Sequence, residues 1–290
     1  MRDIPHTTGA GTLAFAVSLV GLTRTCSVRH LAGSEMPPFI EAGLWGVFTA
    51  AGLPIGATIA VVLYERLSHR FIAAVMGFGG GVLIAVLSVD LMDAAFQHGG
   101  PLPTIFGLLA GAATFSGVNW RLARHGAKHR NRCGGCVQQP RETEHKGSGL
   151  AIAIGAILDG IPESVVIGLS LLGGSKISLG LVAGFFLANI PQGLSSASGM
   201  KTAGRSHRYI FTVWISVPLV FGIAAAAGNL ALSSAPAELP AAILAFAAGG
   251  VLAMLAESMI PEAFEDAQPF MGLITAIGFL SAFLIIKGQG

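Results

Sequence analysis

The sequence predicts an all-α integral membrane protein, a bundle of eight transmembrane helices whose central fourth and fifth helices are broken by proline. Three observations indicate this fold class. Only 11% of the 290 residues are charged and 53% are hydrophobic, whereas an average soluble domain is about 25% charged. The apolar residues gather in long blocks, and the mean hydropathy is +0.71. The third observation is the 40 glycines, because small residues let membrane helices pack closely.

The apolar blocks are long enough to cross a bilayer, since a hydrocarbon core of about 30 Å needs about 20 helical residues. Most blocks are bounded by Gly, Pro or charged residues. The predicted helices cover residues 41–64, 71–96, 102–122, 149–172, 178–200, 209–232, 239–262 and 269–287. Helices one to three therefore occupy residues 41–122, and helices four to eight occupy residues 149–290.

Two segments lie outside the predicted helices. Residues 1–40 form an N-terminal segment whose apolar stretch, 9–22, is too short to span comfortably. This stretch is compatible with a signal-like, accessory or interfacial helix. Residues 123–148 form a predicted cytoplasmic loop that is rich in basic residues and also holds three histidines and the pair Cys133 and Cys136. Such a loop can bind zinc, and the alternatives are a basic loop held near anionic lipid or a redox-active cysteine pair.

Lysine and arginine are distributed unevenly among the links between helices. The link after helix three holds six, with Arg121 just before it at the end of that helix, and the links after helices one and five are also basic. The intervening links contain a single basic residue, Lys176. The positive-inside rule makes the basic links cytoplasmic, so we expect a multi-pass plasma (inner) membrane protein with both ends of the bundle outside. Basic residues confined to these links give no nucleic-acid surface, and three cysteines are too few for a disulfide scaffold.

The stretch ILDGIPES (157–164) places two acids and a proline in the middle of predicted helix four. Asp159 and Glu163 are four residues apart and share one face of a helix. Pro162 has no backbone N–H and clashes with the carbonyl of residue 158, which frees an oxygen. A carboxylate at the bilayer centre costs about 2.5–3.5 kcal/mol. Two of them on one face predict a cation, protons or an aqueous cavity beside them.

Predicted helix five carries a related motif, ANIPQG (188–193), in which Pro191 stands between Asn189 and Gln192. Carboxylate and amide oxygens suit hard or borderline divalent cations, and neither helix contains a histidine or cysteine. Two proline-containing helices with adjacent polar residues are typical of a midplane transport site. The alternative is that the acids are protonated or hydrogen-bonded packing residues and that the amides link helices.

The pattern Ile-Pro followed by Glu or Gln occurs three times, at 161–163, 190–192 and 260–262. These motifs resemble those of the ZIP (Zrt-, Irt-like protein) family of divalent metal transporters. The resemblance covers roughly residues 40–287. It rests on LDGIPES, ANIPQGLSSASGM and MLAESMIPEAFED, with the eight-helix layout and long third link.

The resemblance implies a set of metal ligands. Asp159 stands where the family usually has histidine, Glu163 matches its glutamate, and Asn189 matches a ligand position in helix five. Gln192 replaces a glutamate that usually bridges two metals, and Gly160 replaces a frequent asparagine. We therefore expect one bound ion and no strict selectivity for zinc.

Further candidates lie in helices two and seven. The resemblance places Asp90 near the transport path, and Asp93 is either at the outer mouth or a solvated residue at a helix end. Glu257 is well inside helix seven and is expected on the pathway. Glu262 is expected to be a solvated residue at the cytoplasmic helix end, with an exit station as the alternative.

The predicted function is transport of a divalent metal cation, zinc or a related ion such as Mn, Fe, Co or Cd, toward the cytoplasm. We expect no enzyme activity and no prosthetic group, since the metal is cargo and no Ser/His/Asp group or His-Glu-x-x-His motif is found. The expected partners are the metal and the bilayer, and the resemblance implies alternating access and a homodimer. The alternatives are a proton-coupled carrier of a small organic solute, or an intramembrane hydrolase using Asp90 and Asp159.

Overall fold

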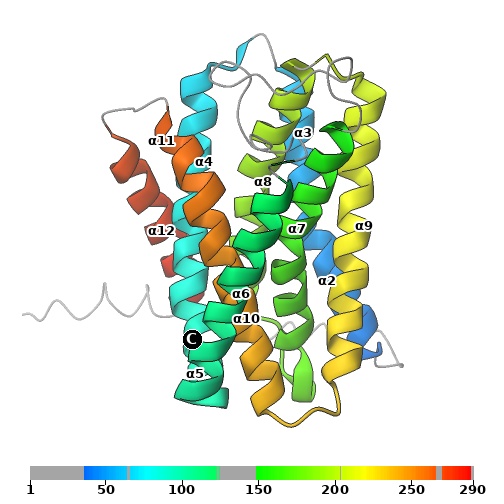
Figure 1. Ribbon diagram of the computed structural model, residues 1–290, viewed down its shortest axis with the longest axis vertical. Helices are drawn as coiled ribbons and strands as arrows, with labels where there is room; N and C mark the ends of the chain where they lie inside the picture. The colour runs from blue at the N-terminus through cyan, green and yellow to red at the C-terminus, as the bar shows by residue number, and fades with distance from the viewer. Residues whose placement is uncertain are drawn as a thin grey trace, which may run out of the picture. The chain divides into compact units, whose positions relative to one another are not determined.

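The computed structural model describes residues 36–63, 66–122, 124, 148–202, 204–265 and 270–288, with backbone only for 122, 148–156 and 265. All regular structure in these ranges is helical (Figure 1). Residues from Pro37 onward belong to one compact unit. The predicted helix at 9–22 lies outside the described residues. So do the histidines and the cysteine pair of the 123–148 loop, whose proposed zinc binding stays a prediction.

Six helices of the described chain are long and apolar enough to cross a membrane, and they identify a membrane protein. Each begins and ends within three residues of a predicted span. They are Pro38–Val62, His69–Gly99, Pro101–Arg121, Leu179–Thr202, His207–Leu232 and Glu238–Phe264. The other two predicted spans correspond to α7 (Ser148–Ser170) and to α12 (Met271–Lys287), which has 17 residues. An eight-span bundle stays a prediction.

The six long spans are built from shorter elements in three cases. The first span is α2 (Pro38–Ala50) followed by α3 (Gly52–Val62). The second span consists of α4 (His69–Val86), the five-residue π-helical segment η4 (Leu87–Leu91) and α5 (Met92–Gly99). The last of the six consists of α10 (Glu238–Met254), the five-residue π-helical segment η7 (Leu255–Met259) and α11 (Ile260–Glu265). A π segment inserts a residue into a helix and often marks a functional position.

The remaining elements are single helices: α6 (Pro101–Leu122), α8 (Leu179–Thr202) and α9 (His207–Leu232), with a short 3₁₀ turn η6 (Leu172–Gly174) after α7. The helices α7 and α8 contain Pro162 and Pro191 but continue on both sides of them. The structure therefore does not confirm the predicted breaks, because each proline removes one backbone N–H without interrupting its helix. The polar residues beside each proline stay on regular helical faces.

Glycines bring the two π-containing helices close to their outer neighbours. A Cβ at Gly81 would lie 1.9 Å from the carbonyl oxygen of Thr275 in α12, and one at Gly249 would lie 2.0 Å from that of Leu108 in α6. No side chain fits at either position. The structure accordingly pairs α4 with α12 and α10 with α6.

Other faces of α4 and α10 pack against the two proline-containing helices. A Cβ at Gly79 would lie 2.5 Å from Cγ of Pro191, and one at Gly250 would lie 3.3 Å from Cγ of Pro162. Figure 1 shows α7 and α8 in the middle of the helices. These contacts hold the two motif-bearing helices in place at the level of their prolines.

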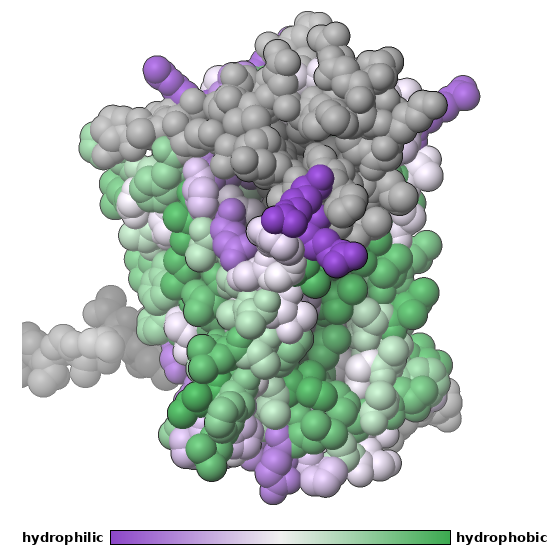
Figure 2. All heavy atoms as spheres, in the orientation of Figure 1, coloured by the Kyte–Doolittle hydropathy of each residue, from purple (hydrophilic) through white to green (hydrophobic). Residues whose placement is uncertain are grey.

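The outer surface is largely apolar over the middle of the helices (Figure 2). Large exposed side chains such as Leu44, Phe106 and Ile223 face outward, as expected for contact with lipid. Basic residues gather at one end, where Ser68 and Ser206 cap α4 and α9 by accepting hydrogen bonds from Phe71 and Tyr209. We name it the basic end, after His69, Lys201, His207 and Arg208, and the other is the opposite end.

Candidate functional site

The centre of the bundle holds a carboxylate and an amide from neighbouring helices. Glu163 of α7 is 2% exposed and Asn189 of α8 is 1% exposed. Nδ2 of Asn189 donates to Oε2 of Glu163 at 3.3 Å and to the backbone carbonyl of Thr49 in α2 at 3.1 Å. The amide is thereby oriented with its nitrogen between two oxygens. We name Asp159, Glu163, Asn189 and Gln192 the central site.

The other two members of the central site are buried as well. Asp159 is 2% exposed and lies one turn before Glu163, close enough to interact with it electrostatically. Gln192 is 6% exposed, follows Asn189 by three residues on α8, and lies within interaction range of the Glu163 carboxylate. The structure thus brings together the four residues that the two motifs predict.

Two oxygen atoms of the central site have no hydrogen-bond donor in the described part of the chain. They are Oε1 of Glu163 and Oδ1 of Asn189, and both are inaccessible to solvent. Buried polar atoms are nearly always paired, because an unpaired one costs about 1–3 kcal/mol, more for a charged group. Two such acceptors on hydrogen-bonded side chains need a proton, a water molecule or a cation to satisfy them.

The position of Gly160 is closed by an aromatic ring. A Cβ there would lie 1.4 Å from Cζ of Phe221 in α9, and Phe221 is 1% exposed. Any larger residue at 160 would compete with this ring for space. The phenyl group therefore occupies the place where the resemblance puts an asparagine.

A second buried polar group lies farther toward the basic end. Ser195 of α8 is fully buried, and its hydroxyl donates to Oε1 of Glu262 in α11. Glu262 is 5% exposed, so the expectation that it is a solvated helix end is wrong. The third Ile-Pro-Glu motif was the signal for it, because Glu163, Gln192 and Glu262 all follow a proline and all point into the interior.

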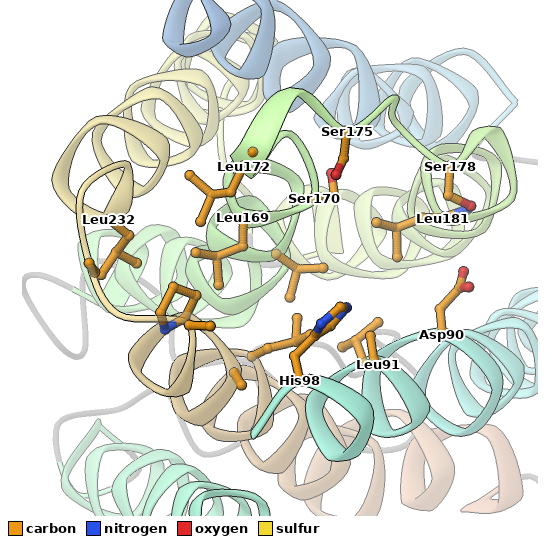
Figure 3. Close-up of a pocket in the computed structure, with 18 of the residues that line it drawn as sticks. Asp90, Leu91, His98, Leu169, Ser170, Leu172, Ser175, Ser178, Leu181 and Leu232 are labelled. Atoms are coloured by element: carbon orange, nitrogen blue, oxygen red, sulfur yellow. The ribbon is translucent and has the colours of Figure 1, made fainter. Parts of the chain in front are cut away.

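Asp90 lies in the π segment η4 and lines a cavity of about 590 Å³ at the opposite end (Figure 3). The cavity wall also includes His98 of α5, and Ser170, Ser175 and Ser178 from the end of α7 and the link to α8. Oδ2 of Asp90 is buried and has no donor among the described residues. Asp93 instead is exposed and accepts a hydrogen bond from Gln97 at 2.8 Å.

Glu257 lies apart from the central site in this structure. It belongs to the π segment η7, is exposed, and accepts hydrogen bonds from the side chains of Ser116 and Asn119 in α6. The Asn119 bond is 2.7 Å long. The structure therefore does not bring Glu257 together with the acids of α7.

Sequence reasoning missed three contributors to this interior: the Thr49 carbonyl, Phe221 and Ser195. A backbone oxygen and a phenyl ring leave no recognisable pattern in a sequence. Ser195 belongs to the run Ser195, Ser196 and Ser198, which is buried throughout. Its spacing of three from Gln192 was a usable signal, because both residues then share a helix face.

No three His, Cys, Asp or Glu side chains come together in a metal-binding group within the described residues. A metal at the central site would need amide, carbonyl or water oxygens to complete its coordination. In comparisons with known proteins, no family profile and no curated sequence matches this chain. The ZIP resemblance accordingly depends on the motifs themselves.

Proposed function

We propose that the protein is a membrane transporter that moves a divalent metal cation through the central site toward the basic end, which the sequence predicts to be cytoplasmic. The observation that carries the proposal is a pair of buried acceptors, Oε1 of Glu163 and Oδ1 of Asn189, for which the described residues supply no donor. The two residues come from different helices and are hydrogen-bonded to each other. A cation between them would satisfy both oxygens and compensate the buried charge.

The chemistry of the central site favours a hard or borderline ion. Asp159 and Glu163 supply carboxylates, Asn189 and Gln192 supply amide oxygens, and none of the four is a nitrogen or sulfur ligand. Mn²⁺, and Zn²⁺ or Fe²⁺ with water ligands, fit such a set better than a softer metal. One ion is expected at this site, because Gln192 stands where the resemblance implies a glutamate that bridges two metals. The Phe221 ring also fills the space at Gly160.

The cavity at the opposite end reaches a residue of α7 that is less than one helical turn from Glu163. Val166, which lines it, follows Glu163 by three residues on α7, or about 4.5 Å along the helix axis. Asp90 places a carboxylate in the cavity wall, and its negative charge would attract arriving cations. Val166, Leu91 and Leu181 are buried apolar residues of the same wall, and we propose that they close the path between cavity and site in this state.

Uptake into proteoliposomes tests the proposal. Mn²⁺, Zn²⁺, Fe²⁺, Co²⁺ and Cd²⁺ are compared for the wild type, Glu163→Gln and the control Glu257→Gln. Loss of a direct ligand should weaken binding by at least about 100-fold, since even supporting contacts are worth about 10–100-fold. We expect Glu163→Gln to abolish uptake and Glu257→Gln to preserve it. Wild-type uptake that Glu163→Gln leaves unchanged would refute the site.

The two rival functions make different demands on the structure. A proton-coupled carrier of an organic solute predicts solute uptake that persists when metal is chelated. An aspartyl hydrolase needs two carboxyl groups close together. Asp90 shares its cavity with Val166 and Leu169 of α7, which follow Asp159 by at least seven residues, or about 10 Å along the helix. This placement gives no support to an Asp90–Asp159 pair.

A further inference from the structure

The cavity at the opposite end has a largely apolar wall. It encloses about 590 Å³ among η4, α5 and the ends of α7, α8, α9 and α10. Six leucines line it: Leu91, Leu169, Leu172, Leu181, Leu232 and Leu244. A cavity of this size, with apolar walls and a few polar groups, is the usual form of a site for a small organic molecule. A hydrated metal ion gains nothing from contact with leucine side chains.

The apolar and polar parts of the wall lie at different ends of the cavity. Figure 3 shows Leu172 and Leu232 on one side of the view, Asp90 and Ser178 on the other, and His98 between them. The cavity is therefore amphipathic along its length. It matches a ligand that carries a charged group at one end and an apolar body at the other.

Asp90 determines which charge the ligand carries. Its Oδ2 atom is buried and has no donor among the described residues, although Lys287 of α12 is close enough to act on the carboxylate electrostatically. A charged N–H group is the strongest donor to a carboxylate oxygen. A primary ammonium has three N–H donors, so one can bond to Asp90 while the hydroxyl oxygens of the same wall remain available to the others.

We propose that this cavity binds a small organic ammonium ion, a primary amine with an apolar body. The ammonium group would contact Asp90, and the apolar body would lie against Leu169, Leu172 and Leu232. The wall also contains Lys176, which suits the carboxylate of an apolar amino acid. Amines and apolar amino acids share the ammonium group that the cavity recognises, and the test below distinguishes them.

Such a ligand would lie across the ion path of the proposed function. The cavity reaches Val166, three residues from Glu163, and a molecule that fills it would also occupy the Asp90 carboxylate. We therefore expect the ligand to inhibit Mn²⁺ uptake from the opposite end. This effect on transport rests on the proposed function, whereas binding of the ligand does not.

Isothermal titration of the full-length protein in lipid nanodiscs, with a metal chelator present, tests the proposal. The probes are phenethylamine, phenylalanine and hydrocinnamate, which share a phenyl body and carry an ammonium, both charged groups or a carboxylate alone. We expect phenethylamine to bind and hydrocinnamate to bind at least about tenfold more weakly, because it lacks the charged donor for Asp90. Tighter binding of phenylalanine than of phenethylamine would identify amino acids as the ligand class, and weaker binding would identify amines.

Two variants test each end of the cavity. Asp90→Asn should weaken phenethylamine binding by about 10- to 100-fold, the usual loss for a hydrogen bond between charged groups. Leu172→Asn should weaken it by about tenfold through lost apolar contact. Asp93→Asn is the matched control, because Asp93 is exposed, lies outside the cavity wall and is hydrogen-bonded to Gln97. We expect it to change the affinity by less than about twofold, since exposed charges are screened.

The outcomes separate this proposal from metal transport. If phenethylamine does not bind the wild type, or binds Asp90→Asn equally well, the ammonium site does not exist and metal transport stands. Equal affinities of the wild type for phenethylamine and hydrocinnamate would overturn the ligand class even if Asp90→Asn does not fold. Mn²⁺ uptake that saturating phenethylamine leaves unchanged would contradict the block. Asp90-dependent amine binding in a protein that takes up no metal would support the cavity site and overturn the transport proposal.

Discussion

Replacing Gly160 by alanine tests how tightly the central site is closed on the side of α9. Gly160 lies on α7 immediately after Asp159, and the ring of Phe221 lies directly over it. Alanine is a better helix former than glycine by about 1 kcal/mol, so helix propensity alone would make the variant more stable. The packing predicts the reverse.

The magnitude follows from the contact distances. The new Cβ would lie 1.4 Å from Cζ of Phe221 and 1.9 Å from Cε2, whereas ordinary contact begins at 3.4 Å. The ring would have to move by about 2 Å in a place where it is 1% exposed. Overpacking of this kind costs about 1–3 kcal/mol. With the gain in propensity subtracted, we expect Gly160→Ala to lower the free energy of unfolding by up to about 2 kcal/mol.

Thermal unfolding in detergent, followed by tryptophan fluorescence, measures this effect. Gly228→Ala is the matched control, because a Cβ at Gly228 in α9 would lie 3.7 Å from Val165 of α7, an ordinary contact. We expect a melting temperature a few degrees below wild type for Gly160→Ala and an unchanged or higher one for Gly228→Ala. Phe221→Leu should restore part of the loss in Gly160→Ala. Equal melting of the two alanine variants would refute the account of this packing.

Two other substitutions test the ligand set and the helix packing. Gln192→Glu adds a carboxylate within range of Glu163. We expect it to tighten Mn²⁺ binding by about tenfold, measured by isothermal titration, and to lower the melting temperature of the ion-free protein through like-charge repulsion. Unchanged Mn²⁺ binding would place residue 192 outside the coordination sphere. Gly111→Ala should destabilise the protein by up to about 2 kcal/mol after the gain in helix propensity is subtracted, since its Cβ would lie 1.9 Å from the carbonyl oxygen of Phe246. Gly117→Ala on the same helix, with nothing within 4 Å of its Cβ, should leave the melting temperature unchanged or raise it.

The helical spans and the central polar residues could be predicted because their signals are local. Apolar runs bounded by glycine, proline or charge fix a span to within a few residues, and acids four apart must share a helix face. Asp159, Glu163, Asn189 and Gln192 are all buried, as the cost of exposing such groups to lipid requires. Their roles as metal ligands stay predictions.

The directions of Glu257 and Glu262 could not be predicted from spacing alone. Both lie within ten residues of each other on one apolar helix, and an ideal helix rotates by about 100° per residue. The π segment Leu255–Met259 inserts a residue just before Glu262 and shifts every later side chain around the axis. No sequence pattern announced that segment, so the exposed and the buried glutamate were expected in reversed places.

The sequence by itself determined that this chain is a membrane protein, where its apolar helices begin and end, and which helices carry polar groups at their centre. These properties depend on composition and on the fixed period of a helix. Only the tertiary structure decided which of these polar groups and side chains contact one another. The contact of Asn189 with Glu163 and Thr49, the ring of Phe221 over Gly160, and the contact of Ser195 with Glu262 each join distant parts of the chain. Helix packing sets such contacts, because membrane helices associate through the fit of whole surfaces, and no single residue fixes which surfaces face each other.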